Sequence, residues 1–156
     1  MSTNITTADL AAGGRSRAVD RADASSRYLV PVGRAAFAAI FIVSFFGHFA
    51  QQTIGYAAAA GVPLAHVVVP LSGIIALAGG LSVLLGYRAR LGAWLLVLFL
   101  VPVTLAIHHF WTVPDPMARQ LDMVMFLKNL SILGGALFIA HAGAGPVSLD
   151  ARAGRR

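Results

Sequence analysis

The sequence predicts an all-α integral membrane protein, folded as a transmembrane bundle of four helices. Of the 156 residues, 58% are hydrophobic and 12% are charged, whereas soluble domains average about 45–50% apolar and about 25% charged residues. Four apolar runs each reach about 20 residues, the length needed to cross about 30 Å of hydrocarbon. Arginines gather at alternate connections between these runs, as expected for a chain that crosses a bilayer repeatedly.

The chain opens with a polar segment, residues 1–27, which we expect to be a disordered basic cytoplasmic tail. It lacks the apolar run of a cleaved signal peptide. The first span is expected at 28–50, with Arg34 close enough to its start to snorkel back to the surface. Residues 51–65 are uncharged and broken by glycine and proline, which predicts a short helix at the membrane interface.

Three further spans are expected at 66–86, 91–111 and 120–143. The four-span membrane domain then covers 28–146, and 147–156 form a second basic cytoplasmic tail. Small residues recur every four positions in two spans, which predicts close packing of helices or a dimer face. These residues are Ser72, Ala76, Gly80, Ala136 and Ala140.

Arginine distribution predicts the orientation. Four arginines lie in the first tail, two in the connection at 87–90 and three in the last tail, while the first connection has none. The positive-inside rule therefore predicts a multi-pass protein with both termini in the cytoplasm. Because arginine outnumbers lysine, as in bacteria with GC-rich genomes, we expect the bacterial inner membrane. The net charge of +6 suits an anionic bilayer surface, and no nucleic-acid partner is expected because no basic helix is interleaved with aromatics.

Several chemistries are excluded or disfavoured. The chain has no cysteine, which excludes disulfides, thiolate zinc sites, iron–sulfur clusters and covalent c-type haem. No metal site is expected, and b-type haem between His48 and His108 or His109 is disfavoured because these residues lie at helix ends near water. No Ser-His-Asp, P-loop or dinucleotide pattern is present.

Lys128, the only lysine, lies inside the fourth apolar run. A lysine placed centrally on a membrane helix costs about 2.5–3.5 kcal/mol. Asp122 is on the same helix, but six residues correspond to about 600° of rotation, so it points elsewhere. We expect Lys128 to face the bundle interior and to meet a carbonyl, a histidine or a bound anion. The alternative is a lysine that snorkels to the outer interface from a depth of about 12 Å.

The predicted orientation puts His48 and His108 at the outer ends of the first and third spans, in the same half as Lys128. These side chains predict an outer-half cleft that could hold a small anion or a carbonyl ligand. Each histidine could instead be a hydrated helix end.

The segment "FLKNLSILGGALFIAHAGAGPVSLD" resembles the end of the DoxX family of small four-helix bacterial membrane proteins. Further matches are "VGRAAFAAIFIVSFFGHF", "AAAAGVP", "LAGGLSVLLGYRARLGAWLL" and "HHFW", so that the resemblance covers about 28–150. The family implies a redox-linked role, since relatives resemble a subunit of thiosulfate:quinone oxidoreductase. The matching polar positions, and hence the candidate ligand cleft, are Arg34, His48, His108, Lys128 and Asn129. Ala76 stands where members often carry a glutamate, and this chain has no glutamate.

The leading functional hypothesis is a small inner-membrane component of a redox system, linked to quinone or a sulfur compound and joined by redox partner proteins. The rival is a non-catalytic membrane scaffold or assembly subunit. A small-solute transporter is a weaker third class, because four spans show no repeat. Substrate, catalytic activity and homo-oligomerisation stay open at this stage.

Overall fold

The computed structural model describes residues 27–154, which are built from helices and turns without a β-strand. This confirms the predicted all-α class. The predicted first tail lies outside the described residues except for Arg27, as do Arg155 and Arg156. The helices are α2 (Leu29–Val43), η1 (Phe45–Phe49), α3 (Gln51–Ala59), α4 (Ala65–Leu85), α5 (Ala89–Ile107), η2 (Phe110–Thr112), α6 (Pro116–Ala142) and α7 (Leu149–Arg152).

Four helical stretches are long and apolar enough to cross a membrane, as predicted. The fourth begins at Pro116, four residues before the predicted start. The reason is a helix cap that the apolar pattern does not reveal: the Asp115 carboxylate accepts a hydrogen bond from the Ala118 N–H at 2.8 Å. Proline also suits the first helical position, where its missing N–H is not needed.

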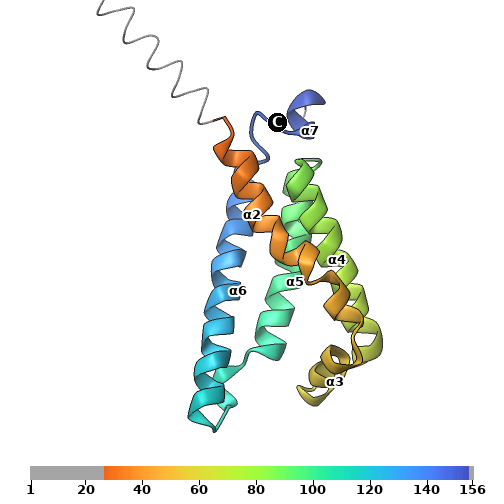
Figure 1. The fold of residues 1–156 in the computed structure, drawn as a ribbon, viewed down its shortest axis with the longest axis vertical. Coiled ribbons are helices and arrows are strands. Elements are labelled where there is room, and N and C mark those ends of the chain that lie inside the picture. Colours follow the sequence, from red (N-terminus) through yellow and green to blue (C-terminus); the bar gives the residue numbers. More distant parts are fainter. Residues whose placement is uncertain (1–26, 155–156) are drawn as a thin grey trace, which may run out of the picture.

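Figure 1 shows how the spans are arranged: α4 and α5 form an antiparallel pair, α6 lies along α5, and α2 crosses the pair obliquely. One end of the bundle holds Tyr28, the α4–α5 turn and α7, and we call it the tail end. The opposite end holds α3 and η2, and we call it the loop end. The predicted short interfacial helix within 51–65 is α3, which seats Ile54 and Ala57 against Ala65 and Val69 of α4.

Small residues bring the helices close together. A Cβ added at Gly79 of α4 would lie 2.8 Å from the carbonyl oxygen of Gly92 on α5, so this crossing depends on glycine. Ala76 and Ala136, both predicted as packing positions, are fully buried. Around them the core contains Phe41, Val83, Leu96 and Leu100, and it holds α2, α4, α5 and α6 together. Close backbone approach through small residues is the usual packing mode for helices in lipid.

Candidate functional site

The five predicted cleft residues occupy three separate regions. Arg34 lies at the tail end, and its guanidinium donates hydrogen bonds of 2.8 Å to the carbonyl oxygens of both Ala144 and Val147. It is 5% exposed. The expectation that Arg34 snorkels to the surface is therefore wrong, because residues 144–148 fold over it and supply its acceptors.

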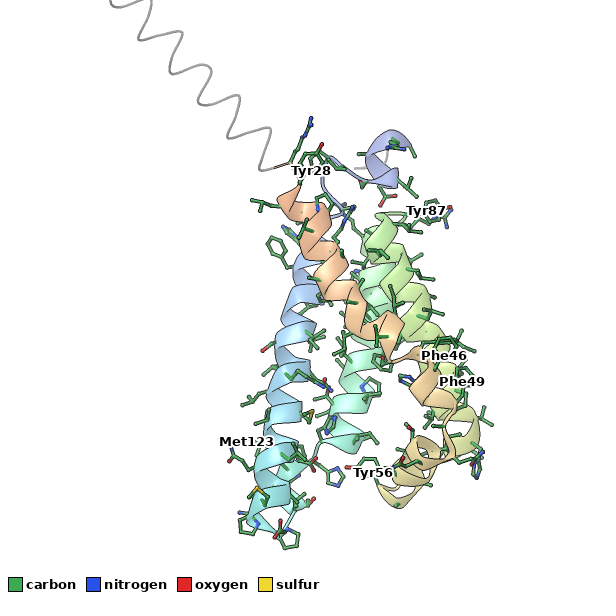
Figure 2. The ribbon with its side chains drawn as sticks, in the orientation of Figure 1. Tyr28, Phe46, Phe49, Tyr56, Tyr87 and Met123 are labelled. Atoms are coloured by element: carbon green, nitrogen blue, oxygen red, sulfur yellow. The ribbon has the colours of Figure 1, made fainter. Side chains whose placement is uncertain are left out.

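His48 lies towards the loop end, where it lines an apolar groove of about 320 Å³ between α3, α4 and α5. We call this space the loop-end groove. The His48 ring packs 5.8 Å from the Phe99 ring, centroid to centroid. Its Cβ covers Gly73, where an added Cβ would lie 2.6 Å away. Tyr56, which also lines the groove, extends from α3 towards α5 (Figure 2).

The hydrogen bonding of His48 defines what it can offer a ligand. Its Nδ1 lies 3.0 Å from the carbonyl oxygen of Ser44. Because a carbonyl only accepts, Nδ1 must carry the proton of that bond, and Nε2 of the neutral ring is left as an acceptor. Three further groove residues carry hydroxyl groups: Thr53, Tyr56 and Ser72. The groove thus suits a mainly apolar molecule with a hydrogen-bonding end.

A second polar group lies between α5 and α6. His108 ends α5, and its Nδ1 is 3.6 Å from Oδ1 of Asp122 on α6. This is an ion-pair distance but too long for a hydrogen bond, and the buried Nδ1 has no hydrogen-bond partner in the described part of the chain. Asn129, also on α6, is 7% exposed.

We expected Lys128 to face the bundle interior, but the structure places it outside the packed core. Its side chain is exposed, and its Nζ lies 3.4 Å from the thioether sulfur of Met125, one turn away on the same helix. The difference follows from helix geometry. Neighbouring residues are separated by about 100°, and α6 buries the adjacent Asn129 while it leaves Lys128 exposed.

The loop-end groove includes His48 but neither His108 nor Lys128. The side chains of His108 and Asp122 form a contact between the end of α5 and α6. Arg34 makes its hydrogen bonds at the tail end of the bundle. Sequence reasoning missed the Asp122 partner of His108, although both residues flank the same short connection. Among residues 27–154, no three histidine or carboxylate side chains gather as a metal site would require.

The largest set of polar contacts missed by sequence reasoning lies at the tail end. Both carboxylate oxygens of Asp150 accept backbone hydrogen bonds at the start of α5, from the N–H of Arg88 at 2.8 Å and of Ala89 at 2.9 Å. The Asp150 N–H donates to the carbonyl of Gly86 at 2.8 Å. Together with the two bonds from Arg34, these contacts form what we call the tail-end clasp. The predicted tail at 147–156 is thus folded onto the bundle over its described part.

A signal for the clasp existed in the sequence. Ser148 caps α7 by accepting from the N–H of Ala151 at 3.1 Å, and serine is a preferred N-cap. That pattern, "SLDA", predicts a local helix start. It does not predict which distant backbone groups Asp150 will meet.

Comparison with known proteins gives a consistent result. The family model described as "SURF4 family" matches residues 27–155. The chain is 28% identical over 126 residues to "Inner membrane protein YphA" of Escherichia coli, covering 80% of this chain and 89% of that protein. It is 33% identical over 95 residues to "Inner membrane protein YqjF" of the same organism, covering 61% of this chain and 67% of that protein.

A eukaryotic relative matches over a smaller share of its length. The chain is 39% identical over 70 residues to "Surfeit locus protein 4 homolog" of Drosophila melanogaster, covering 44% of this chain and 26% of that protein. No solved structure matches the chain.

These matches overturn the predicted DoxX membership, because the residues quoted for that resemblance lie inside the segment that the SURF4 model matches. The quoted motifs depend strongly on small residues such as the pairs Gly79-Gly80 and Gly134-Gly135. Gly79 serves the α4–α5 crossing, and such packing glycines recur in membrane bundles of unrelated families.

Proposed function

The chain belongs to the SURF4 family and is a multi-pass membrane protein, and from this premise we propose that it is a non-catalytic membrane scaffold. Its partner is a different membrane protein, whose transmembrane helix binds along α6 and carries a carboxylate at the level of Lys128. The redox role was inferred from the DoxX resemblance, and the match to the SURF4 family removes the basis for that inference. Inner-membrane localisation remains the expectation, supported by the names of the two bacterial relatives.

The observation that carries the proposal is the exposed ammonium group of Lys128. Twelve residues separate Lys128 from Pro116 and fourteen separate it from Ala142, so it lies about 18 Å and about 21 Å from the two ends of α6. An unpaired charge near the middle of a membrane helix costs about 2.5–3.5 kcal/mol. Its sole hydrogen-bonding contact in the described chain is the Met125 thioether, a weak acceptor.

An acceptor from outside the chain would offset that cost. Asp122, the other charged side chain within the apolar part of α6, pairs with His108 and is mostly buried. A carboxylate on a partner helix could approach Lys128 directly, and a charge-assisted hydrogen bond of this kind is worth about 1.5–3 kcal/mol.

The surface beside Lys128 favours a helix over a small ligand. Of the four spans, α6 is the one least covered by the rest of the chain. Exposed leucine and valine side chains flank the lysine, among them Leu121, Val124 and Leu127. Farther along, Ser131 and Gly134 are exposed, and a Cβ at Gly134 would meet no atom within 4 Å. Small residues on a bare helix face permit the close approach of another helix.

A crosslinking experiment tests the proposal. A photo-crosslinking amino acid is placed at Ser131 on α6 or, as a control, at the exposed Ile74 of α4, and native membranes are irradiated. We expect crosslinking from Ser131 to give one discrete adduct whose mass clearly differs from that of two copies of the chain. Crosslinking from Ile74 should give no adduct. The adduct should disappear in Lys128→Met and persist in Leu127→Met, which alters the neighbouring exposed side chain.

The stability of the same variants separates partner binding from folding. Lys128→Met removes a charge from the lipid-facing surface, so the purified bundle should unfold at the same temperature or higher. An adduct that survives Lys128→Met would mean that the lysine is only a snorkelling anchor. An adduct with the mass of a dimer would identify a second copy as the occupant and contradict the choice of partner.

A further inference from the structure

A large basic cavity opens at the tail end, apart from α6 and from the loop-end groove. Its volume is about 870 Å³. The walls are the first turn of α5, the end of α6 and the segment that leads into α7, and the charged residues among them are Arg88, Arg90 and Asp150. Figure 2 shows Tyr87 at this end of the bundle.

The walls of the cavity are fixed by the tail-end clasp. Arg34 holds the carbonyls of Ala144 and Val147, and Asp150 holds the first N–H groups of α5. Ser148 adds a bond from its hydroxyl to the Gly145 carbonyl at 2.7 Å. The cavity is therefore preformed, and a ligand would not have to order this segment on binding.

The two arginines that line the cavity are available to a ligand. Within residues 27–154, neither guanidinium has an ion pair or a hydrogen-bond acceptor. The Arg88 guanidinium lies 5.7 Å from the centre of the Tyr87 ring. Arg90 lies over Gly143, where an added Cβ would be 3.3 Å from Nε. Among the described residues, no ion pair joins Asp150 to either of these arginines.

The position of the cavity identifies the level of the bilayer that it faces. It lies where α5 begins and α6 ends, at the boundaries of two membrane spans. Phospholipid phosphates lie at that level. Leu91 lines the same cavity and is more than half exposed, which provides an apolar surface towards the hydrocarbon.

We propose that this cavity binds the headgroup of an anionic phospholipid, with Arg88 and Arg90 on the phosphate. Guanidinium groups pair with phosphate oxygens through parallel N–H bonds. A zwitterionic lipid fits less well, since its ammonium would face two guanidinium groups and a single carboxylate, that of Asp150. The proposal does not depend on which leaflet the tail end occupies, and it is independent of the partner proposed for α6.

Lipid binding to the purified full chain tests the site. Native mass spectrometry measures the binding of phosphatidylglycerol and of phosphatidylethanolamine in separate titrations. We expect phosphatidylglycerol to bind more tightly, and its affinity to fall about tenfold to hundredfold in the double variant Arg88→Gln/Arg90→Gln, as expected for lost charge-assisted bonds. Arg152→Gln is the control matched in charge to the single variants Arg88→Gln and Arg90→Gln, because it removes one positive charge at the same end from a residue outside the cavity.

Three results would overturn the site. The first is equal binding of the two lipids. The second is an equal loss in Arg152→Gln, which would indicate attraction by overall charge. The third is displacement of phosphatidylglycerol by excess inorganic phosphate, which would identify a site for the free anion. If the double variant fails to fold, the single variants Arg90→Gln and Arg90→Lys decide: glutamine should weaken binding and lysine should retain part of it, and equal binding by both contradicts the proposal.

Discussion

Gly86 is a residue on which three segments of the chain converge. It ends α4 with φ +64°, in the left-handed region that favours glycine. Its carbonyl accepts the N–H of Asp150. A Cβ at this position would overlap the Arg34 guanidinium and would lie 2.6 Å from the Cβ of Ser148. A side chain here therefore conflicts with both the backbone and the tail-end clasp.

The first prediction concerns this glycine. Gly86→Ala should lower the unfolding free energy by more than about 1 kcal/mol, the usual cost of a left-handed alanine, because displacement of Arg34 adds to it. Thermal unfolding in detergent measures the change. Gly33→Ala is the control: it lies inside α2 with open space around it, so alanine should be neutral or stabilising by up to about 1 kcal/mol. Equal stability of the two variants would contradict the role of Gly86.

The residue scale shows where sequence reasoning succeeds and where it ends. That His48 and His108 both lie in the loop-end half follows from their places at the ends of apolar runs. The burial of Arg34 could not be predicted, because its acceptors are two backbone carbonyls 110 and 113 residues away. The exposure of Lys128 was missed because both faces of the fourth run are apolar, so hydropathy does not define which face is packed.

At the scale of elements, α5 begins in an unusual way. Arg88, at the N-cap position, has φ +48° and makes no side-chain cap. The cap comes instead from Asp150, 61 and 62 residues farther along the chain. A carboxylate at this place satisfies two N–H groups that the helix cannot pair itself, and it interacts favourably with the helix dipole. The start of α5 and the docking of α7 therefore depend on one side chain.

The second prediction tests that dependence. Asp150→Ala should weaken docking of the C-terminal segment by about 1–2 kcal/mol, the range for loss of a helix cap. The population of molecules in which this segment is detached would then rise about fivefold to thirtyfold. Limited trypsin cleavage after Arg152 should accelerate by the same factor. Asp150→Asn keeps one acceptor oxygen, so its cleavage rate should lie between those of the unchanged chain and of Asp150→Ala. Unchanged cleavage in Asp150→Ala would show that the cap does not hold α7.

For the whole molecule, charge divides the bundle into two unlike ends. The described arginines at the tail end include Arg27, Arg88, Arg90 and Arg152, whereas Arg119 lies at the loop end. Arg119 is held by a hydrogen bond of 2.8 Å from its Nε to the Val113 carbonyl. The positive-inside rule therefore predicts that the tail end faces the cytoplasm.

The third prediction is a labelling experiment on that orientation. Because the chain has no cysteine, a single introduced cysteine reports one position without background. A membrane-impermeant maleimide should label Thr112→Cys at the loop end in intact cells. It should label Ala153→Cys at the tail end only after the cells are permeabilised. Labelling of Ala153→Cys in intact cells would reverse the orientation.

The architecture of the whole molecule was largely predictable. Hydropathy and length alone locate four spans, since each must satisfy its backbone groups internally within lipid. Family membership was not predictable from the quoted motifs, which reflect helix packing shared by many bundles. The folding of residues 144–152 onto the α4–α5 turn was also missed, because it depends on hydrogen bonds between distant segments and leaves no periodic pattern.

The tail-end clasp also has a consequence for the order in which the protein is made. Arg34 leaves the ribosome 110 residues before its acceptor Ala144, a delay of about 6–22 s at typical rates of synthesis. Three spans can enter the membrane during that interval while the guanidinium still lacks its permanent partners. Residues 144–150 follow all four spans, so the Arg34 acceptors and the Asp150 cap are translated only after those spans. A chain released before Ala144 would contain the four spans, yet its first and third spans would lack these contacts.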